Sequence, residues 1–401
     1  MSMNKDFKMT ATTLFGLESV LANELKQLGA QDVKEGIRVV SFRGDTGFMY
    51  KANIALRTAV RILKPIKVCK IYDEEDLYEA IQKIKWENYL ETEGTFAIGA
   101  VVNSKNFTSN SHYISLKSKD AIADYFRHKY SKRPNVDLDY PDLKIHIHIH
   151  KEWLTVSLDS SGDSLHKRGY RTATNIAPIN EVLAAGMVLL SGYTGEENFI
   201  DPMCGSGTIL IEAAMIANNI PANINRKLFA FENWKDYNED LYFTIQDALL
   251  KKIRSSHFKI MGFDKAPSAV QKAQANIENA NLSEFIGVHH VNFFNSKKEV
   301  FGNTTILFNP PYGERLNIDT EEFYKKIGDT LKHNYPGSMA WLITSDIDAL
   351  KCVGLRTSKR IALKNGDLNC KFVKYELYEG TRKFRTEKEI SDTDTDTNME
   401  K

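Results

Sequence analysis

The segment FIDPMCGSGTILIEAA, residues 199–214, decides the fold of this chain. An apolar strand pattern ends at Asp201, small residues follow in a loop, and an apolar helix pattern begins at Thr208. In an open α/β sheet, ligands bind at the carboxyl ends of the strands, where glycine admits a ligand to the backbone and a helix N-terminus offers free N–H groups. The segment therefore predicts a ligand-binding strand, loop and helix. The candidate binding residues are Asp201, Pro202, Cys204, Gly205, Ser206, Gly207 and Thr208.

The next strand pattern, KIMGFD at residues 259–264, ends at Asp264, and Asp264 and the following Lys265 are further candidate binding residues. A carboxylate in that place can accept hydrogen bonds from both hydroxyls of a ribose, and a helix N-cap is its alternative role. Asp264 lies 63 positions after Asp201, far more than the roughly 20 of the usual dinucleotide-binding arrangement. An insertion at about 219–256 accounts for the excess. Neither a GxxxxGK[ST] phosphate loop nor GxGxxG spacing is present.

Strand and helix patterns alternate from residue 198 onward, which predicts a doubly wound, mostly parallel sheet of the α/β class. Two late strand patterns predict a hairpin at one edge of that sheet. The expected strands are 198–202, 259–264, 285–291, 304–311 and 339–345, the helices 208–217, 268–280 and 321–334, and the hairpin 359–366 with 371–380.

The fourth of these strands ends in NPPYGERL, and its first four residues indicate methylation of a planar amine. The lone pair of an exocyclic amine is delocalised into the base ring, so a catalyst must favour a pyramidal nitrogen. The side-chain oxygen of Asn309 and the carbonyl of Pro310 can accept the two N–H hydrogens, while Pro310 and Pro311 fix the geometry. Tyr312 can stack on a base that is turned out of its helix. These four residues are the candidate catalytic residues, and a structural turn is the alternative.

The front of the chain predicts two small α+β domains, at residues 1–45 and 46–162. A helical pattern after Asp45, GFMYKANIALRTAVRILKPI at residues 47–66, carries Lys51, Arg57, Arg61 and Lys64, and Lys67 follows it. A basic loop leads into residues 163–385, the third expected domain. Residues 1–180 hold 26 basic and 22 acidic side chains, an excess that permits RNA binding but also suits an ordinary solvated face. The candidate RNA-binding residues are Lys51, Arg57, Arg61, Lys64, Lys67, Lys167, Arg168 and Arg171.

Histidines and isoleucines alternate at residues 145–150, which is the period-2 pattern of a half-buried strand. His146, His148 and His150 then share one face. Three histidines in line along a strand do not converge on a tetrahedral centre, so we expect no metal site here. A solvated or RNA-facing strand is the favoured interpretation.

The four cysteines are far apart, and none forms a CxxC pair, which predicts neither a disulfide framework nor a zinc site. No apolar run approaches the roughly 20 residues of a membrane-spanning helix, and the first residues lack the apolar core of a signal peptide. We therefore expect a soluble cytoplasmic protein with neither membrane nor metal as a partner. The polar, acidic segment 386–401 is expected to be disordered.

DPMCGSGT, GFD and NPPYGERL, in this order and each at a strand end, resemble the Rossmann-like (class I) methyltransferases that modify amino groups of bases. The front part, with GLESVLANELKQLGA and SGDSLHKRGYR before APINE, resembles the THUMP-containing RNA methyltransferases. The likeness covers nearly the whole chain and extends to the enzymes that make N2-methylguanosine in bacterial large-subunit ribosomal RNA. It implies a ferredoxin-like unit, a THUMP domain and a methyltransferase domain, with S-adenosylmethionine as cofactor and ribosomal RNA as substrate.

The resemblance also implies roles for single residues. Asp201, Gly205 and Gly207 would hold the methionine part of the cofactor, Asp264 its ribose, and Asn309 to Tyr312 the target amine. Pro178 and Glu181 match the helix that precedes the first strand and flanks the cofactor. Asn292 stands where relatives commonly have an aspartate that contacts the adenine amine; its side-chain oxygen can still accept that hydrogen bond.

Three other functions fit parts of the pattern. NPPY serves any planar amine, so an N6-adenine methyltransferase that acts on DNA is one alternative, although the front domains point to structured RNA. A guanine-N2 methyltransferase of transfer RNA is another. A non-catalytic RNA-binding or ribosome-assembly factor is the third, and the intact Asp201, Asp264 and Asn309 disfavour it.

Overall fold

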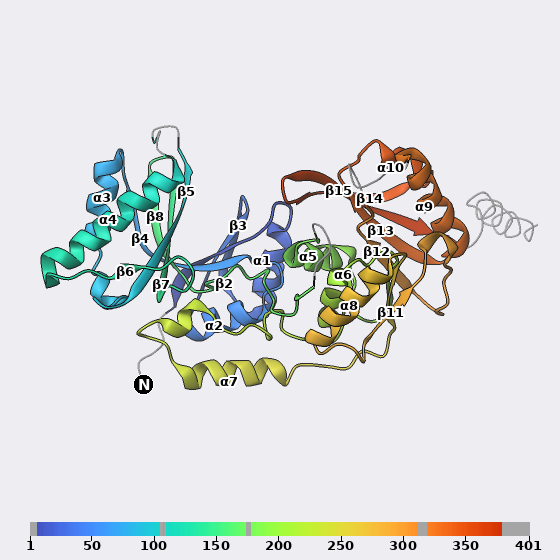
Figure 1. Cartoon of the computed structure of the whole chain (residues 1–401), viewed down its shortest axis with the longest axis horizontal. Helices are drawn as coiled ribbons and strands as arrows, with labels where there is room; N and C mark the ends of the chain where they lie inside the picture. The colour runs from blue at the N-terminus through green and yellow to red at the C-terminus, as the bar shows by residue number, and fades with distance from the viewer. Residues whose placement is uncertain (1–5, 105–106, 108–109, 174–177, 312–318, 379–401) are drawn as a thin grey trace, which may run out of the picture. The chain divides into compact units, whose positions relative to one another are not determined.

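The computed structural model describes residues 6–104, 107, 110–173, 178–311 and 319–378 (Figure 1). Tyr312 and the acidic segment 386–401 lie outside the described residues. The chain forms two compact units: Met1–Gly169 with Asn219–Ile253, and Tyr170–Asn218 with Arg254–Lys401. Residues 219–253, which the sequence placed inside the 163–385 domain, therefore pack with the front of the chain.

The first unit is built on one continuous eight-stranded sheet with the order β2-β3-β1-β4-β8-β7-β5-β6. Asp45 starts α2 by accepting a 2.7 Å hydrogen bond from the backbone N–H of Phe48, and Gly29 ends α1 in the left-handed conformation. The elements of its first half are β1 (Phe7–Thr12), α1 (Glu18–Leu28), β2 (Gln31–Gly36), β3 (Val39–Gly44), α2 (Thr46–Ala55) and β4 (Arg61–Lys70).

The helix expected after Asp45 is shorter than predicted. It ends at Ala55, and residues 61–70 form strand β4, which pairs antiparallel with both β1 and β8. Pro65 has no N–H to continue a helical ladder, and the branched residues nearby favour an extended chain. Arg61, Lys64 and Lys67 therefore lie on a strand, and the prediction of one basic helix was wrong.

The second half of this sheet confirms the alternation of histidine and isoleucine. Ile145, Ile147 and Ile149 are buried in the core, while the histidines occupy the other face of β7. The elements are α3 (Glu74–Gln82), η1 (Trp86–Asn88), β5 (Thr95–Asn103), α4 (Ser111–Tyr130), β6 (Asn135–Val136), β7 (Leu143–His150) and β8 (Trp153–Asp159).

The insertion completes the core of the first unit. It contains η2 (Ala230–Asn233) and α7 (Glu239–Leu250). Phe231 is fully buried and stacks on Tyr50 of α2 with ring centroids 4.4 Å apart, and Trp234 and Tyr242 join the same apolar cluster. These large aromatic side chains are buried in the core of the first unit, and their burial stabilises the insertion there.

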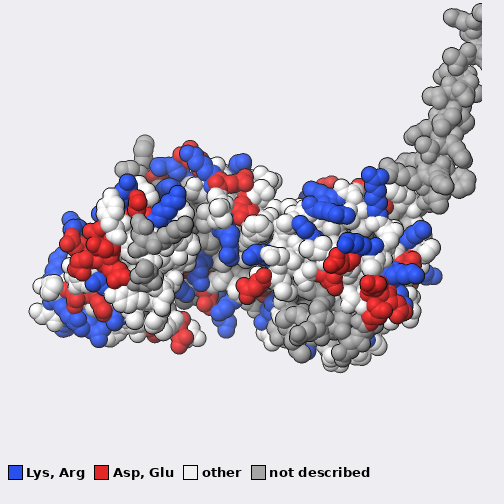
Figure 2. Space-filling model, turned by 90° about the horizontal axis from the view of Figure 1, so that it is seen from above, with Lys and Arg blue, Asp and Glu red and all other residues white. Residues whose placement is uncertain are grey.

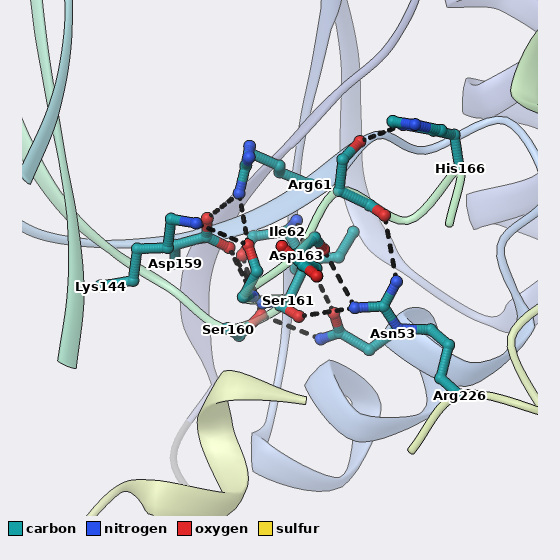
Figure 3. A network of polar contacts seen from close by, with 12 residues as sticks. Asn53, Arg61, Ile62, Lys144, Asp159, Ser160, Ser161, Asp163, His166 and Arg226 are labelled. Atoms are coloured by element: carbon teal, nitrogen blue, oxygen red, sulfur yellow. Dashed lines mark hydrogen bonds and ion pairs between the residues drawn. The ribbon is translucent and has the colours of Figure 1, made fainter. Parts of the chain in front are cut away.

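A polar network joins the insertion to the loop that follows β8 (Figure 3). Arg226 donates to four backbone carbonyls, those of Ser161, Asp163, Ser164 and Lys167, at 2.9 to 3.2 Å. Burial lowers its pKa to about 10, so it remains charged at neutral pH. The Arg226 side chain thus supplies hydrogen bonds to loop carbonyls that are not paired with a neighbouring strand.

The second unit confirms the doubly wound sheet, with the order β11-β10-β9-β12-β13-β15-β14. The first five strands in this order run parallel, and β15 and β14 form the expected antiparallel edge. Its elements are α5 (Glu181–Ser191), β9 (Asn198–Asp201), α6 (Thr208–Ala217), β10 (Ile260–Asp264), α8 (Pro267–Asn279), β11 (Ile286–His290), η3 (Phe293–Asn295), β12 (Thr304–Phe308), α9 (Thr320–Asn334), β13 (Ser338–Thr344), α10 (Ala349–Cys352), β14 (Thr357–Asn365) and β15 (Leu368–Leu377).

The strand order reverses at β9, which pairs with β10 on one side and with β12 on the other. The chain therefore leaves β9 and β12 in opposite directions across the sheet, and their carboxyl ends flank the crevice in which α/β proteins bind ligands. Asp201, Asp264 and Asn309 follow these three strands at the same edge.

Replacing Arg226 with alanine should leave four carbonyls of the 161–167 loop without a buried donor. We expect the first unit to lose about 2–4 kcal/mol of unfolding free energy, measured by urea denaturation, and amide exchange in residues 161–168 to accelerate. Lys227→Ala, at the exposed neighbouring position, is the control and should change neither. Unchanged exchange in that loop would contradict the role given to Arg226.

Candidate active site

The loop between β9 and α6 is a tight turn that glycine makes feasible. Gly205 and Gly207 have φ angles of 55° and 82°, in the left-handed region. A Cβ on Gly207 would lie 3.2 Å from the Cβ of Ala273 on α8. The N-terminus of α6 therefore lies close to α8, and the first N–H groups of a helix have no partner within the helix.

A second close contact occurs at Gly262 of β10, where Leu210 and Cys204 lie against the backbone. This glycine was not among the predicted site residues. A Cβ there would lie 2.3 Å from Cδ1 of Leu210 and 3.1 Å from Sγ of Cys204. Cys204 is buried, and its backbone N–H donates to the carbonyl of Phe263 at 2.9 Å. Burial raises the pKa of its thiol well above the usual range, so the side chain serves as neutral packing. The neighbouring Pro202 and Ser206 are also buried.

The two strand-end carboxylates have different surroundings. Asp201 is 1% exposed, and its Oδ1 accepts a 3.1 Å hydrogen bond from the N–H of Met203. Burial raises its pKa well above the usual range, and the charge of Asp264 adds to the shift. Asp264 is partly exposed; Oδ2 accepts from the N–H of Gly205 at 3.0 Å and Oδ1 from that of Ala266 at 2.9 Å. The oxygens of Asp264 retain lone pairs for further donors, such as the hydroxyls of a ribose.

The residues that follow these carboxylates along the chain are accessible. Lys265 is exposed. Asn292 is exposed too, and its Oδ1 caps η3 by accepting from the N–H of Phe294 at 3.1 Å. This oxygen can accept one more hydrogen bond.

Residues Tyr170–Ala173 are tied to the ligand-binding loop by Asn276 of α8. The side chain of this 1% exposed residue accepts from the N–H groups of Thr172 and Ala173 and donates to the carbonyls of Ala173 and Ser206, at 2.8 to 3.1 Å. The sequence analysis missed this residue, because an asparagine within a helical pattern gives no signal of its partners.

Arg171 belongs to the same part of the structure and was predicted to bind RNA. Its Nε lies 3.2 Å from Oε1 of Glu181, and its Nη2 donates to the carbonyl of Ile179 and to Oγ1 of Thr208, both at 2.8 Å. Glu181 is 3% exposed at the start of α5, and Pro178 is partly exposed. Arg171 thus joins the start of α5 to the start of α6, so the RNA-binding prediction for this side chain is corrected.

The acceptor side of the crevice is formed by the end of β12. Asn309 is partly buried, and its Oδ1 is fully shielded from solvent with no hydrogen-bond donor among the described residues. Pro310 is buried and Pro311 partly so. A buried amide oxygen without a donor costs about 1–3 kcal/mol. With respect to the described residues, this oxygen can accept a hydrogen bond from a ligand.

Arg168 was also predicted to bind RNA, and its burial contradicts this. It is 1% exposed, and its guanidinium donates to the carbonyls of Leu165 and Arg57 and to Oδ1 of Asn223. All of these contacts lie within the first unit. The basic sequence pattern could not distinguish a structural arginine from a surface one.

The other predicted RNA contacts are partly engaged by protein groups. Arg61 forms an ion pair with the buried Asp159. The Nη2 of Arg57 donates to the carbonyl of Ile220 at 2.7 Å, and Lys51 donates to that of Leu28 at 2.6 Å. Lys64 lies 3.4 Å from a carboxylate oxygen of Asp236.

Lys67 lies on β4 opposite Val156, and Lys167 pairs with Asp163 at 3.3 Å while remaining 60% exposed. Figure 2 shows basic side chains interspersed with acidic ones on the visible face. The basic residues of the front half therefore do not identify an RNA surface by themselves.

Among the described residues, no three His, Cys, Asp or Glu side chains are grouped to hold a metal ion. None of the described helices has the length and apolar character that crossing a membrane demands.

Three family models match the chain. The model of the RMKL-like methyltransferase domain matches residues 168–374, that of the THUMP domain residues 72–159, and that of the RlmL ferredoxin-like domain residues 8–63.

Relatives match over nearly the full length. The Synechocystis sp. (strain ATCC 27184 / PCC 6803 / Kazusa) protein slr0064, provisionally assigned as an RNA methyltransferase, is 36% identical over 92% of this chain and 96% of its own. The structure of SMU.472, a provisionally assigned methyltransferase complexed with SAH, has a TM-score of 0.85 and 31% identity, covering 94% of this chain and 100% of that one. A Listeria monocytogenes str. 4b F2365 structure, described as a predicted N6-adenine-specific DNA methylase, has a TM-score of 0.83 and 28% identity, covering 93% and 97%.

These matches confirm the expected fold class and cofactor. The chain belongs to the RMKL-like methyltransferase family and is an RNA methyltransferase that depends on S-adenosylmethionine, with ferredoxin-like, THUMP and Rossmann-like methyltransferase domains.

Proposed function

We propose that this enzyme methylates the exocyclic N2 amine of a guanine in RNA, and that its substrate is the large-subunit ribosomal RNA. The observation that carries the chemistry is the buried Oδ1 of Asn309, which has no donor among the described residues and is followed by two prolines. An acceptor so placed suits an amine that brings two N–H groups. Guanine and ribosomal RNA rest on the likeness of residues 8–63 to the RlmL ferredoxin-like domain.

The residues of the second unit fit S-adenosylmethionine. The glycine loop keeps Cβ atoms away from the backbone N–H groups at the start of α6, which would receive the methionine carboxylate. Asp264 has lone pairs for the ribose hydroxyls, and Asn292 has one for the adenine amine. When bound, the cofactor supplies an electrophilic methyl group on a sulfonium.

Methyl transfer then depends on how the chain holds the amine. Asn309 Oδ1 and the Pro310 carbonyl accept the two N–H hydrogens, which favours a pyramidal nitrogen and directs its lone pair toward the methyl donor. The amine loses one proton after transfer, and these acceptors stabilise the positive charge that develops on the nitrogen. Tyr312, outside the described residues, is proposed to stack on the base.

Adenine N6 is the second candidate target, because a pair of acceptors serves any planar amine and the Listeria monocytogenes relative is described with that specificity. Transfer RNA is the second candidate substrate. A non-catalytic factor would have no use for an acceptor at Asn309 that is buried without a donor among the described residues.

Asn309→Ala should lower kcat/KM for RNA methylation by roughly 10²-fold or more, because the acceptor for the amine is lost. The affinity for S-adenosylmethionine, measured by calorimetry, should stay within about 2-fold. Asn309→Asp keeps an acceptor at the same place and should retain more activity than the alanine variant. Wild-type methylation by Asn309→Ala would refute the mechanism.

Gly207→Ala should weaken binding of S-adenosylmethionine by roughly 10-fold, because the new Cβ is strained in the left-handed region and approaches Ala273. Gly192→Ala is a matched control: its φ of 85° is similar, but nothing lies within 4 Å of its Cβ. It should cost stability of about 1 kcal/mol and leave cofactor affinity unchanged. Equal losses of affinity in both variants would remove the loop from the cofactor site.

Nucleosides of ribosomal RNA from cells that lack the gene test the choice of base. Mass spectrometry should show loss of one N2-methylguanosine from large-subunit RNA, restored by the wild-type gene and not by the Asn309→Ala gene. Loss of N6-methyladenosine instead, or loss of N2-methylguanosine from transfer RNA alone, would redirect the proposal to the corresponding alternative.

A further inference from the structure

The open face of the first unit's sheet carries a surface that the proposed chemistry does not use. Four adjacent strands, β4, β8, β7 and β5, align two rows of side chains across it. One row is Lys70, Trp153, His150 and Asn103, and the other is Val68, Thr155, His148 and Val101. We call these eight residues the open-face surface.

This surface lies on the opposite side of the sheet from the apolar core. Its neighbours along the strands, such as Ile149 and Leu154, are fully buried. Trp153 is 47% exposed, Val68 56% and Val101 42%. Large side chains on the face of a sheet normally lose water to a covering layer, so an exposed group of them marks an interaction site.

The rings of the open-face surface are arranged as a stacking platform. His148 and His150 lie nearly parallel, with centroids 6.3 Å apart and an interplanar angle of 17°. The ammonium of Lys70 lies 5.6 Å from the centroid of the Trp153 ring. An exposed indole beside a lysine offers a base a flat apolar surface and its phosphate a cation.

Charge and rings together favour a nucleic-acid partner, because cations attract any polyanion whereas exposed rings add a stacking surface for bases. None of the eight residues is acidic, and the turn between β7 and β8 adds the exposed Lys151 and the half-buried Glu152. Proteins bind unpaired RNA by combining such cations with aromatic side chains.

We infer that the open-face surface binds unpaired nucleotides of the RNA substrate by stacking them on Trp153 and His150, with Lys70 contacting the backbone. The inference rests on the RNA-methylating function of the chain and concerns how the RNA is held. It requires neither guanine as the target base nor ribosomal RNA as the substrate.

The tryptophan content of the chain provides a direct test. Of the four tryptophans, Trp86, Trp234 and Trp341 are at most 6% exposed, which leaves Trp153 as the accessible one. The full-length protein is titrated with an oligouridylate of about ten nucleotides, and with an RNA duplex of the same length. The single strand should quench the accessible fluorescence, whereas the duplex should do so weakly, since its bases are stacked internally.

Variants measured with a labelled single strand complete the test. Trp153→Ala should weaken binding roughly 5- to 100-fold, while Trp153→Phe, which keeps a ring, should stay within about 3-fold. Lys70→Ala should reduce the salt dependence of log Kd by about 0.7, one phosphate contact on a single strand. Tyr140→Ala, an 86% exposed aromatic outside the surface, is the control and should bind like the wild type.

Equal binding by Trp153→Ala and the wild type would overturn the inference. The inference would also be overturned if Trp153 became shielded from solvent as the protein concentration rises in the absence of RNA. That result would assign the surface to a second copy of the chain. Because the assay measures only oligonucleotide binding, its failure would leave the roles of Asn309 and of the target base untouched. Circular dichroism of each variant verifies folding. We expect the variants to fold because Trp153 and Lys70 are exposed side chains.

Discussion

The site depends on one constraint, the left-handed turn between β9 and α6. Gly205 and Gly207 let the chain reverse within a few residues, and the absence of Cβ atoms at Gly207 and Gly262 lets the turn, α6, α8 and β10 meet at van der Waals distance. The N–H of Gly205 then reaches the carboxylate of Asp264. A side chain at Gly207 or Gly262 would push apart the elements that meet there.

Buried polar groups on either side of this turn bind it to the rest of the second unit. Asn276 satisfies backbone groups of the 172–173 segment and of Ser206 at once, and Arg171 links the starts of two helices. Groups so well satisfied make a rigid frame. Asn309 differs because its oxygen has been taken out of water without a donor among the described residues.

Most of the second unit could be predicted from sequence because its signals are local. Each parallel strand is a short apolar run that ends in a polar residue, so Asp201, Asp264 and Asn309 were correctly expected at one edge of the sheet. The edge hairpin was predicted for the same reason. The expected helix failed at residues 61–66, where pairing of β4 with two other strands decides the conformation and no local pattern reports it.

Partners remote in sequence explain the other misses. Strand β2, with almost no buried residue, has no apolar alternation to detect. Arg168 and Arg171 look like surface cations, yet their partners Asn223 and Thr208 lie 55 and 37 positions away. By its position in the sequence, the insertion was expected to belong to the methyltransferase domain. Only the packing of Phe231 and Trp234 in the core of the first unit shows where it belongs.

The placement of the insertion has a consequence for synthesis on the ribosome. The chain enters the second unit at Tyr170, returns to the first at Asn219 and leaves it again after Ile253. The first unit therefore lacks part of its core until Leu249 has emerged, although β8 ends at Asp159. During that interval the nascent front half exposes the apolar surface that will receive Phe231 and Trp234, and strand β9 emerges before its neighbours β10 and β12 exist. The first unit can therefore complete its core only after the insertion has emerged, well after its sheet has been synthesised, and the second unit completes its sheet later still, with β15.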